Sequence, residues 1–336
     1  MPNPPTPIFV LGGARNGTTW LSNLLGLHPR VASVHHELHH GSHESNIFRQ
    51  HRYYGDLSDT DAYIRFAQLF ATEDYFRIAG GDPARLYQKR YPDFYTAFFD
   101  LMDELARREG RTHWTTKLDP LFALDPPRYR EFRAALGRRY PTVKWVGIQR
   151  RGVACLNSYL FMEGQNNAAR TRSRASRLAA LTLGAARYVA QYRFLNGVLE
   201  EERGFAMTFG ELQREREATG QRLDAYLSLA NSLAVGVPDQ YAKNTSFKGR
   251  TRDGSLTSGE RQYAAALLAT YRAAPWLARA VYSTHENRIK GIRDPSYRKL
   301  LKRQHFGDEF RDELGRVGAS DLLERLDHAT DDDARP

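Results

Sequence analysis

A glycine-rich turn near the N-terminus constrains the fold of this chain more than any other feature of its sequence. Residues 7–12 are an apolar run typical of a short buried strand, and the stretch from Thr18 to Leu27 is typical of a helix that ends before Pro29. The turn between them begins with a pair of glycines and ends with Gly17. A strand, a glycine-rich turn and a helix in this order open a nucleotide-binding α/β domain. The N-terminal residues therefore predict an α/β fold with an anion site at its first turn.

The turn fits the pattern G-x-x-x-x-G followed by hydroxyl residues, with one departure from the loops of ATP and GTP enzymes. In those enzymes a lysine follows the second glycine and reaches the phosphates, and the next hydroxyl holds magnesium. Thr18 stands in the place of that lysine here, and Arg15 brings a cation into the loop itself. An arginine at this point could stabilise a leaving phosphate without a metal bridge. The sequence therefore disfavours a P-loop kinase or NTPase, which stays open as an alternative.

The loop resembles the 5′-phosphosulfate-binding loop of the superfamily of sulfotransferases that use PAPS (3′-phosphoadenylyl sulfate). Members of that family have a lysine or arginine followed by Ser-Gly-Thr-Thr, so Asn16 in place of the serine is a mild departure. The resemblance implies a P-loop-NTPase-like α/β fold in three layers, a parallel sheet flanked by helices, with a helical insertion. It also implies that the following residues bind the donor: Gly13, Ala14, Arg15, Asn16, Gly17, Thr18, Thr19 and Trp20.

A second element resembles the part of the same family that holds the 3′-phosphate of PAPS. Residues 143–148 are predicted to form a buried strand, Arg150 follows it, and Ser158 lies at the family's offset of eight residues after the arginine. The resemblance assigns both side chains to the 3′-phosphate. The turn reads Arg151-Gly152 where the family has Asp-Pro, a change that adds positive charge to an anion site.

Members of the family often close over the 3′-phosphate and adenine with a basic, glycine-containing loop late in the chain. Residues 243–250 occupy that position here, but their detailed pattern does not match. An ordinary surface loop is therefore an equal alternative. The residues that the resemblance assigns to the donor in this loop are Lys248, Gly249 and Arg250.

The resemblance also supplies candidates for the catalytic groups. An acceptor hydroxyl must lose a proton as it attacks, so a base belongs near the sulfur. Glu37 follows Arg15 at the spacing of the catalytic glutamate in the heparan-type branch, which assigns it the role of base, with His35 and His36 as substitutes. Lys117 lies in a segment that resembles the Lys-Asp-Pro segment of the carbohydrate and tyrosylprotein branches. The resemblance implies that this lysine and Arg15 support charge on the bridging oxygen.

The residues around Glu37 also spell H-E-x-x-H, the zinc-binding string of some proteases. That string works only on a helix long enough to aim both histidines, His36 and His40, at one metal. Gly41-Ser42 ends any helix here within a turn, so no metal site is predicted. A zinc hydrolase stays open as a second alternative.

The charge of the chain indicates an anionic partner. Its 336 residues carry a formal net charge of +10, with the basic residues spread along the chain. Four classes of partner meet this requirement: nucleic acid, acidic lipid, polyanionic sugar and nucleotide. We find no nucleic-acid-binding motif, so we do not expect the chain to bind nucleic acid. The single cysteine, Cys155, fits a reducing compartment. Since we find neither an apolar stretch of about 20 residues nor a secretory signal, we expect a cytoplasmic protein.

The rest of the chain predicts one domain over residues 1–325 and a disordered acidic tail over 326–336. Residues 41–112 are predicted to be a mostly helical insertion on the acceptor side. Tyrosines within it either stack against a sugar, lipid or peptide or belong to the core; they are Tyr53, Tyr54, Tyr75, Tyr87, Tyr91 and Tyr95. Further helices are predicted over 128–140, 175–203, 219–234 and 258–272, and a strand over 205–209.

Together these features predict transfer of a sulfonate group from PAPS to an acceptor hydroxyl, with release of PAP (3′,5′-ADP) and without a metal. The branches that match favour a carbohydrate or glycolipid hydroxyl, with a tyrosine or another phenol second. The expected partners are the nucleotide donor and this acceptor. The sequence makes no prediction of the oligomeric state.

Overall fold

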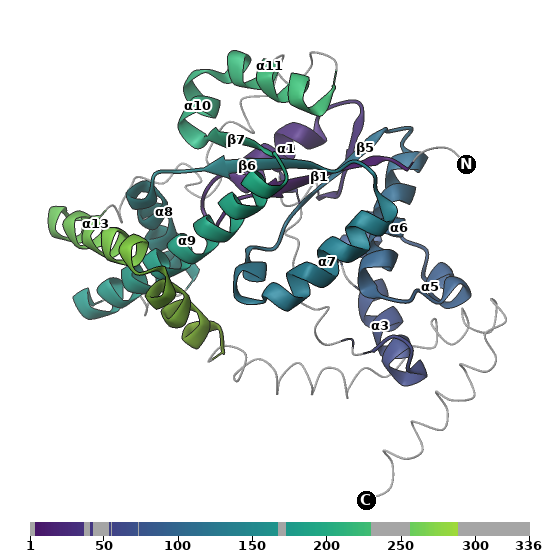
Figure 1. The fold of residues 1–336 in the computed structure, drawn as a ribbon, viewed down its shortest axis with the longest axis horizontal. Helices are drawn as coiled ribbons and strands as arrows, with labels where there is room; N and C mark the ends of the chain where they lie inside the picture. Colours follow the sequence, from purple (N-terminus) through teal and green to yellow (C-terminus); the bar gives the residue numbers. More distant parts are fainter. Residues whose placement is uncertain are drawn as a thin grey trace, which may run out of the picture. The chain divides into compact units, whose positions relative to one another are not determined.

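A parallel five-stranded sheet organises the part of the chain that contains the glycine loop (Figure 1). The structure, a computed structural model, describes residues 4–36, 41–42, 54, 56–72, 74–166, 173–229 and 256–287. The strands of the sheet are β1 (Thr6–Leu11), β2 (Val31–Ser33), β5 (His113–Lys117), β6 (Lys144–Gln149) and β7 (Phe205–Thr208). They lie in the order β2-β5-β1-β6-β7, and their pairings are parallel. The predicted α/β fold is confirmed.

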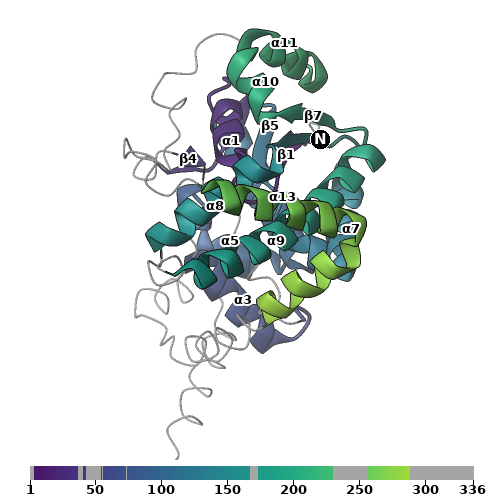
Figure 2. The same ribbon diagram turned by 90° about the vertical axis from the view of Figure 1, so that its left-hand side faces the viewer.

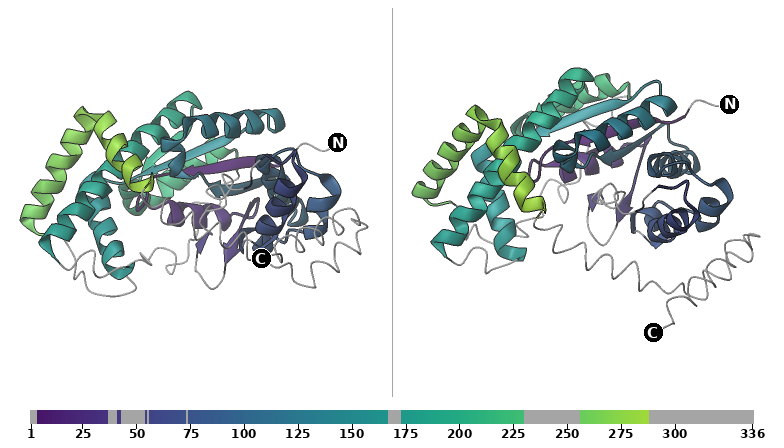
Figure 3. Two further views of the ribbon diagram at one scale, coloured as in Figure 1. Left: turned by 90° about the horizontal axis from the view of Figure 1, so that it is seen from below. Right: turned by 60° about the horizontal axis from the view of Figure 1, so that its bottom comes forward.

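Helices cover both faces of this sheet, which gives the three layers that the resemblance implies. Helices α1, α10 and α11 lie on one face, and α7 and α9 lie on the other (Figures 1 and 2). The green helices α13 and 275–287 pack beside α8 and α9 (Figure 3). The bounds are α1 (Thr18–Gly26), η3 (Pro120–Leu124), α7 (Pro126–Arg139), α8 (Gly152–Asn166), α9 (Arg174–Glu201), α10 (Phe209–Arg214), α11 (Arg216–Leu227) and α13 (Ser258–Ala273).

Strand β1 sends its side chains to both faces, because successive residues of a strand point to opposite sides. Ile8 and Val10 belong to an apolar cluster shared with α1, α10 and α11. Phe9 points to the opposite face, where its ring stacks on Trp145 and meets the ring of Phe132 edge-on. All of these side chains are fully buried. The strand that leads into the glycine loop is therefore fixed from both sides.

The residue contacts divide the chain into two compact units, of which the sheet forms the first, Met1–Ser45 with Leu105–Ile289. The described part of the second unit lies within Asn46–Glu104. It holds α3 (Thr60–Thr72), α4 (Asp74–Ile78), α5 (Pro83–Lys89) and the start of α6 (Phe94–Arg108). The predicted organisation as one domain stays a prediction, and the predicted tail lies outside the described residues. In the described part, no helix has the length and apolar character needed to cross a membrane.

The tyrosines of this second unit belong to its core. The five that the structure describes are between 1% and 7% exposed: Tyr54, Tyr75, Tyr87, Tyr91 and Tyr95. They pack in an aromatic core in which the rings of Phe66 and Phe70 stack 5.3 Å apart. Tyr53 lies outside the described residues. Of the two alternatives from the sequence, the core therefore holds for the described tyrosines, since a buried ring is not available for stacking on an acceptor.

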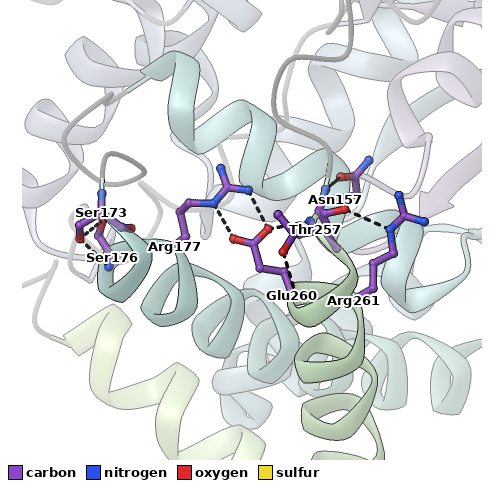
Figure 4. A network of polar contacts seen from close by, with 8 residues as sticks. Asn157, Ser173, Ser176, Arg177, Thr257, Glu260 and Arg261 are labelled. Atoms are coloured by element: carbon purple, nitrogen blue, oxygen red, sulfur yellow. Dashed lines mark hydrogen bonds and ion pairs between the residues drawn. The ribbon is translucent and has the colours of Figure 1, made fainter.

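A polar network fastens α13 to α9 and α8 (Figure 4). Arg177 of α9 donates to both carboxylate oxygens of Glu260, at 2.6 Å and 2.9 Å. Glu260 also closes a capping box with Thr257 at the start of α13. Directly before Thr257, the backbone N–H of Leu256 donates to Asn157 Oδ1 of α8 at 2.9 Å. The start of α13 is thus tied to the helix that carries Ser158, the next residue after Asn157.

Glu260→Gln is expected to weaken this junction. The hydrogen bonds from Arg177 lower the pKa of Glu260 from its ordinary 4.5 to about 2, against an opposing effect of burial. Because the folded-state pKa is depressed, the stabilisation is fully present above pH 4.5 and is lost as the pH falls toward 2. The side chain is only 10% exposed, so we expect the variant to lose about 1–3 kcal/mol of unfolding free energy at pH 7.

Urea unfolding at pH 7 and pH 3 measures this effect. Wild type should lose stability between the two values, while Glu260→Gln should lose less. The matched control is Glu200→Gln at an exposed position of α9. If the unfolding free energies of wild type and Glu260→Gln depend equally on pH, the contact with Arg177 does not lower the pKa of Glu260.

Candidate active site

The glycine loop between β1 and α1 contains two residues with left-handed backbone conformations. Gly17 has a φ of 102°, and a Cβ added there would lie 2.6 Å from the ring of Phe209. As the N-cap of α1, Gly17 has no side-chain oxygen for the first N–H groups of the helix, so its positive end is left for an anion. Arg15 has a φ of 69°, a conformation that costs an arginine on the order of 1 kcal/mol and that collects at functional sites. The backbone of the loop therefore leaves the N-terminus of α1 without a side-chain cap, as the predicted anion site requires.

Side chains join this loop to the second predicted nucleotide element. Arg15 Nε donates to Ser158 Oγ at 3.2 Å. The backbone N–H of Arg150 donates to Asn16 Oδ1 at 2.8 Å. Asn16 and Ser158 are both buried. The structure thus brings together four predicted residues, and the asparagine that departs from the family pattern ties the loop to the end of β6.

The guanidinium of Arg150 packs over the ring of Phe209, a contact that the sequence did not predict. Its central carbon lies 5.0 Å from the ring centre of Phe209, a cation–π distance. Tyr188 Oη donates to the Arg150 carbonyl at 2.8 Å. The neighbouring Arg151 is exposed. Packing therefore distinguishes the two consecutive arginines and orders only the first of them.

Strand β5 ends at Lys117, whose ammonium lies against the first turn of α1. Lys117 Nζ donates to Thr19 Oγ1 at 3.0 Å, and the lysine is buried. Its register partner is Val10 of β1, so the lysine lies level with the start of the glycine loop. The structure thus places a fixed positive charge at the N-terminus of α1, on the opposite side of β1 from Arg150.

Gln191 of α9 holds the loop from the face of the sheet that α9 covers. Its Oε1 accepts a hydrogen bond from the backbone N–H of Ala14 at 3.1 Å, and its Nε2 donates to Tyr282 Oη at 2.9 Å. The side chain is fully buried. A Cβ added at Gly13 would lie 3.0 Å from Gln191 Oε1, so the glycine permits this close approach. The glutamine therefore couples the loop to the helix over residues 275–287.

Gln191→Leu is expected to loosen the loop. The change keeps the approximate volume of the side chain but removes the partner of the half-buried Ala14 N–H and of the buried Tyr282 hydroxyl. We expect a loss of about 2 kcal/mol of unfolding free energy and an affinity for PAP that is about tenfold weaker. Gln221→Leu, at an exposed glutamine of α11, is the matched control. Reduced stability with unchanged PAP affinity in calorimetry would mean that Gln191 joins the helices without positioning the loop.

Cys155 is a structural thiol in this arrangement. Burial raises the pKa of its thiol to about 12, although Arg150, Arg15 and Arg187 act in the opposite direction. The protonated Sγ donates to the carbonyl oxygen of Ala14 at 3.1 Å. A thiol that stays protonated is a poor nucleophile. Its contribution is to fix the loop carbonyl that faces α8.

Comparison with known protein families identifies the family of this chain. A family model described as "Sulfotransferase family" matches residues 7–232, which include β1, the loop, Lys117, Arg150 and Ser158. The chain belongs to the sulfotransferase family. Membership of this family indicates that the chain transfers a sulfonate group.

Three solved structures resemble this sulfotransferase-family chain at low identity. The "Sulfotransferase Domain from the Synechococcus PCC 7002 Olefin Synthase" is 15% identical, with a TM-score of 0.46, over 80% of this chain and 96% of that one. The "Sulfotransferase Domain from the Curacin Biosynthetic Pathway" is 15% identical, with a TM-score of 0.44, over 80% and 98%. The sulfotransferase STF9 from Mycobacterium avium is 14% identical, with a TM-score of 0.43, over 82% and 76%. No curated protein matches the chain.

For several other predicted residues of this sulfotransferase-family chain, the structure does not provide the expected contact or does not describe the residue. The predicted base, Glu37, and the late loop Lys248-Gly249-Arg250 lie outside the described residues. His36, the first residue of the zinc-binding string, lies in strand β3 (His35–His36), which pairs with β4 (Gly41–Ser42), so the helix that the string needs does not begin there. Trp20 packs edge-on against Phe209, and its assignment to the nucleotide stays a prediction.

Proposed function

We propose that this chain transfers a sulfonate group from PAPS to an acceptor hydroxyl and releases PAP. The observation that carries the proposal is the hydrogen bond from Lys117 Nζ to Thr19 Oγ1. Thr19 occupies the position of the hydroxyl that holds magnesium in the loops of ATP and GTP enzymes. An ammonium group already lies against that hydroxyl here. A fixed cation thus stands where a kinase would recruit a metal ion.

The arrangement of the arginines supports a donor with a 3′-phosphate. Arg150 and Ser158 lie together with Arg15 on the β6 side of the loop. Two guanidinium groups on one side of a phosphate-binding turn favour a nucleotide with a second phosphate, because charge-assisted hydrogen bonds from arginine are directional and strong. ATP has no phosphate at the 3′ position.

In the proposed reaction the residues of this chain bind, orient and balance charge. Glu37 takes the proton of the acceptor hydroxyl. The acceptor oxygen forms a bond to sulfur as the bond from sulfur to the bridging oxygen breaks, and that electron pair leaves with the 5′-phosphate of PAP. Lys117, Arg15 and the N–H groups at the start of α1 stabilise the negative charge that develops on this phosphate. Neutral acceptor and PAPS thus become sulfated acceptor, PAP and one proton.

For the acceptor, we propose a carbohydrate or glycolipid hydroxyl first and a phenol or tyrosine second. The proposal follows the branches that Lys117 and Glu37 resemble. The burial of the described tyrosines between Tyr54 and Tyr95 removes them as a stacking surface. Residues outside the second unit's core must therefore recognise the acceptor.

Thermal unfolding tests the donor. PAP at about 100 times its dissociation constant should stabilise the protein by about 2.7 kcal/mol, a shift of a few degrees. ATP with magnesium should give a much smaller shift, because it lacks the 3′-phosphate. Stabilisation by magnesium-ATP alone would overturn the proposal and favour a kinase.

A further inference from the structure

Arg187 is a half-buried cation beside the glycine loop, and it has no role in the proposed reaction as described above. It lies on α9 one turn before Gln191, and residues four apart on a helix share a face. Tyr282 links the two, since its ring centre lies 5.9 Å from the Arg187 guanidinium carbon and its hydroxyl accepts from Gln191. Because Gln191 bonds directly to Ala14, Arg187 lies beside the glycine loop.

The guanidinium has unused hydrogen-bonding capacity. Arg187 Nε is shielded from solvent and has no hydrogen-bond partner among the residues that the structure describes, nor does an ion pair join the side chain to a described carboxylate. A shielded N–H donor without a partner is costly, so a protein that keeps one gains when a ligand oxygen completes it. The flat fork of N–H donors on arginine fits the oxygen atoms of phosphate, carboxylate or sulfonate.

The surroundings of Arg187 keep it charged without filling its donors. Burial opposes its charge, but Tyr282, Tyr159, Glu286 and Asp119 together outweigh this effect and raise the pKa of the guanidinium. The carboxylates act from beyond ion-pair distance. The side chain is therefore a permanent cation with donors left for an oxyanion.

The position of Arg187 relative to the glycine loop indicates which oxyanion. Gln191, one turn further along α9, accepts a hydrogen bond from the backbone N–H of Ala14 inside the loop at 3.1 Å. The guanidinium of Arg150 lies instead over the ring of Phe209, and Arg150 is the residue proposed for the 3′-phosphate. The loop resembles the part of the family that holds the 5′-phosphosulfate, so an arginine beside it is placed for the sulfonate end of the donor.

We propose that Arg187 binds the oxygen atoms of the sulfonate carried by the donor. The proposal rests on the proposed function and adds a residue to it. PAPS carries this sulfonate and PAP lacks it, so comparing the two nucleotides isolates the contact. Calorimetric titrations of each nucleotide, without acceptor, into wild type and Arg187→Gln provide the test.

We expect Arg187→Gln to bind PAPS about tenfold more weakly or worse, since it loses charge-assisted hydrogen bonds, with PAP affinity changed by less than about twofold. Arg187→Lys should fall between, because it keeps the charge but not the fork. The matched control is Arg193→Gln, an exposed arginine of the same helix that lines a groove between α7 and α9. It should bind both nucleotides like wild type.

Thermal unfolding without ligand distinguishes a ligand-binding arginine from a purely structural one. Replacing a structural arginine would lower the melting temperature. Removing a half-buried charge that has no ion-pair partner among the described residues should leave the melting temperature of Arg187→Gln equal to or above that of wild type. A clear drop would overturn the proposal in favour of a structural role. Arg187→Lys serves if Arg187→Gln does not fold.

Other results of the titrations would assign Arg187 a different role. Equal losses for PAP and PAPS would assign Arg187 to the nucleotide phosphates, and no loss for either would remove it from the donor site. Each of these overturns the proposal while leaving the proposed function in place. If wild type binds neither nucleotide, the proposed function fails and the assignment of Arg187 fails with it.

Discussion

Lys117→Met is expected to lower kcat by about 10²–10³-fold while PAP affinity stays within about threefold, because the ammonium stabilises charge that develops only in the transition state. The geometry for this role is the contact of Lys117 Nζ with Thr19 Oγ1 at the first turn of α1. Methionine keeps the length and apolar body of the side chain. Steady-state rates at saturating PAPS, together with PAP titrations, separate the two quantities.

The control for this prediction is Lys144→Met. Lys144 is a lysine of β6, and its Nζ donates to the carbonyl oxygen of Tyr226, away from the loop. It should retain its kcat. If Lys117→Met keeps its kcat but loses PAP affinity, the lysine binds the nucleotide in the ground state and the proposed role is wrong.

Arg150→Ala is expected to weaken PAP binding by about a hundredfold, the effect of losing a charge-assisted pair with a phosphate. The side chain is ordered over Phe209, so little conformational entropy is lost when it binds. Affinity for 5′-AMP, which lacks the 3′-phosphate, should change far less. The variant should therefore lose the ability to distinguish the two nucleotides.

Arg151→Ala is the matched control, since it removes the same charge from the adjacent, exposed residue. It should bind PAP nearly as wild type does. Equal losses in both variants would show that general positive charge, rather than a specific contact of Arg150, attracts the nucleotide. Measurements at two salt concentrations would strengthen the comparison, because screening weakens the general effect more.

The sequence predicted those parts of the site that depend on local backbone. The strand, glycine loop and helix from Thr6 to Gly26 follow from a contiguous pattern, as do β6, Arg150 and Ser158. The ends of elements were less well predicted. Helix α11 ends at Leu227 rather than near 234, because Ser228 adopts a left-handed conformation with a φ of 57°. A serine in that conformation carries no sequence signal comparable to that of a glycine.

The residues contributed by α9 could not be found from the sequence. Gln191 bonds to Ala14, a residue of the loop 177 positions earlier in the chain, and Tyr188 bonds to the carbonyl of Arg150. Arg187 lies one turn from Gln191 on the same helix. Helix α9 is covered on several sides, by η3, α8 and α13, so no single apolar face marks which side meets the loop. Their roles depend on tertiary packing. Asn16 shows the same limit, since its departure from the family pattern was visible but its bond to Arg150 was not.

The hydrogen-bonded connection from Ala14 through Gln191 to Tyr282 has a consequence for the order in which the protein matures. A ribosome synthesises the glycine loop first and Tyr282 much later. A nascent chain that stops before residue 275 already contains the loop and Arg150, but the amide of Gln191 lacks the hydroxyl that accepts from it. The hydrogen bonds around the glycine loop are therefore completed only after Tyr282 has been added to the chain. Chains truncated before this helix would carry every sequence motif of the site without its finished geometry.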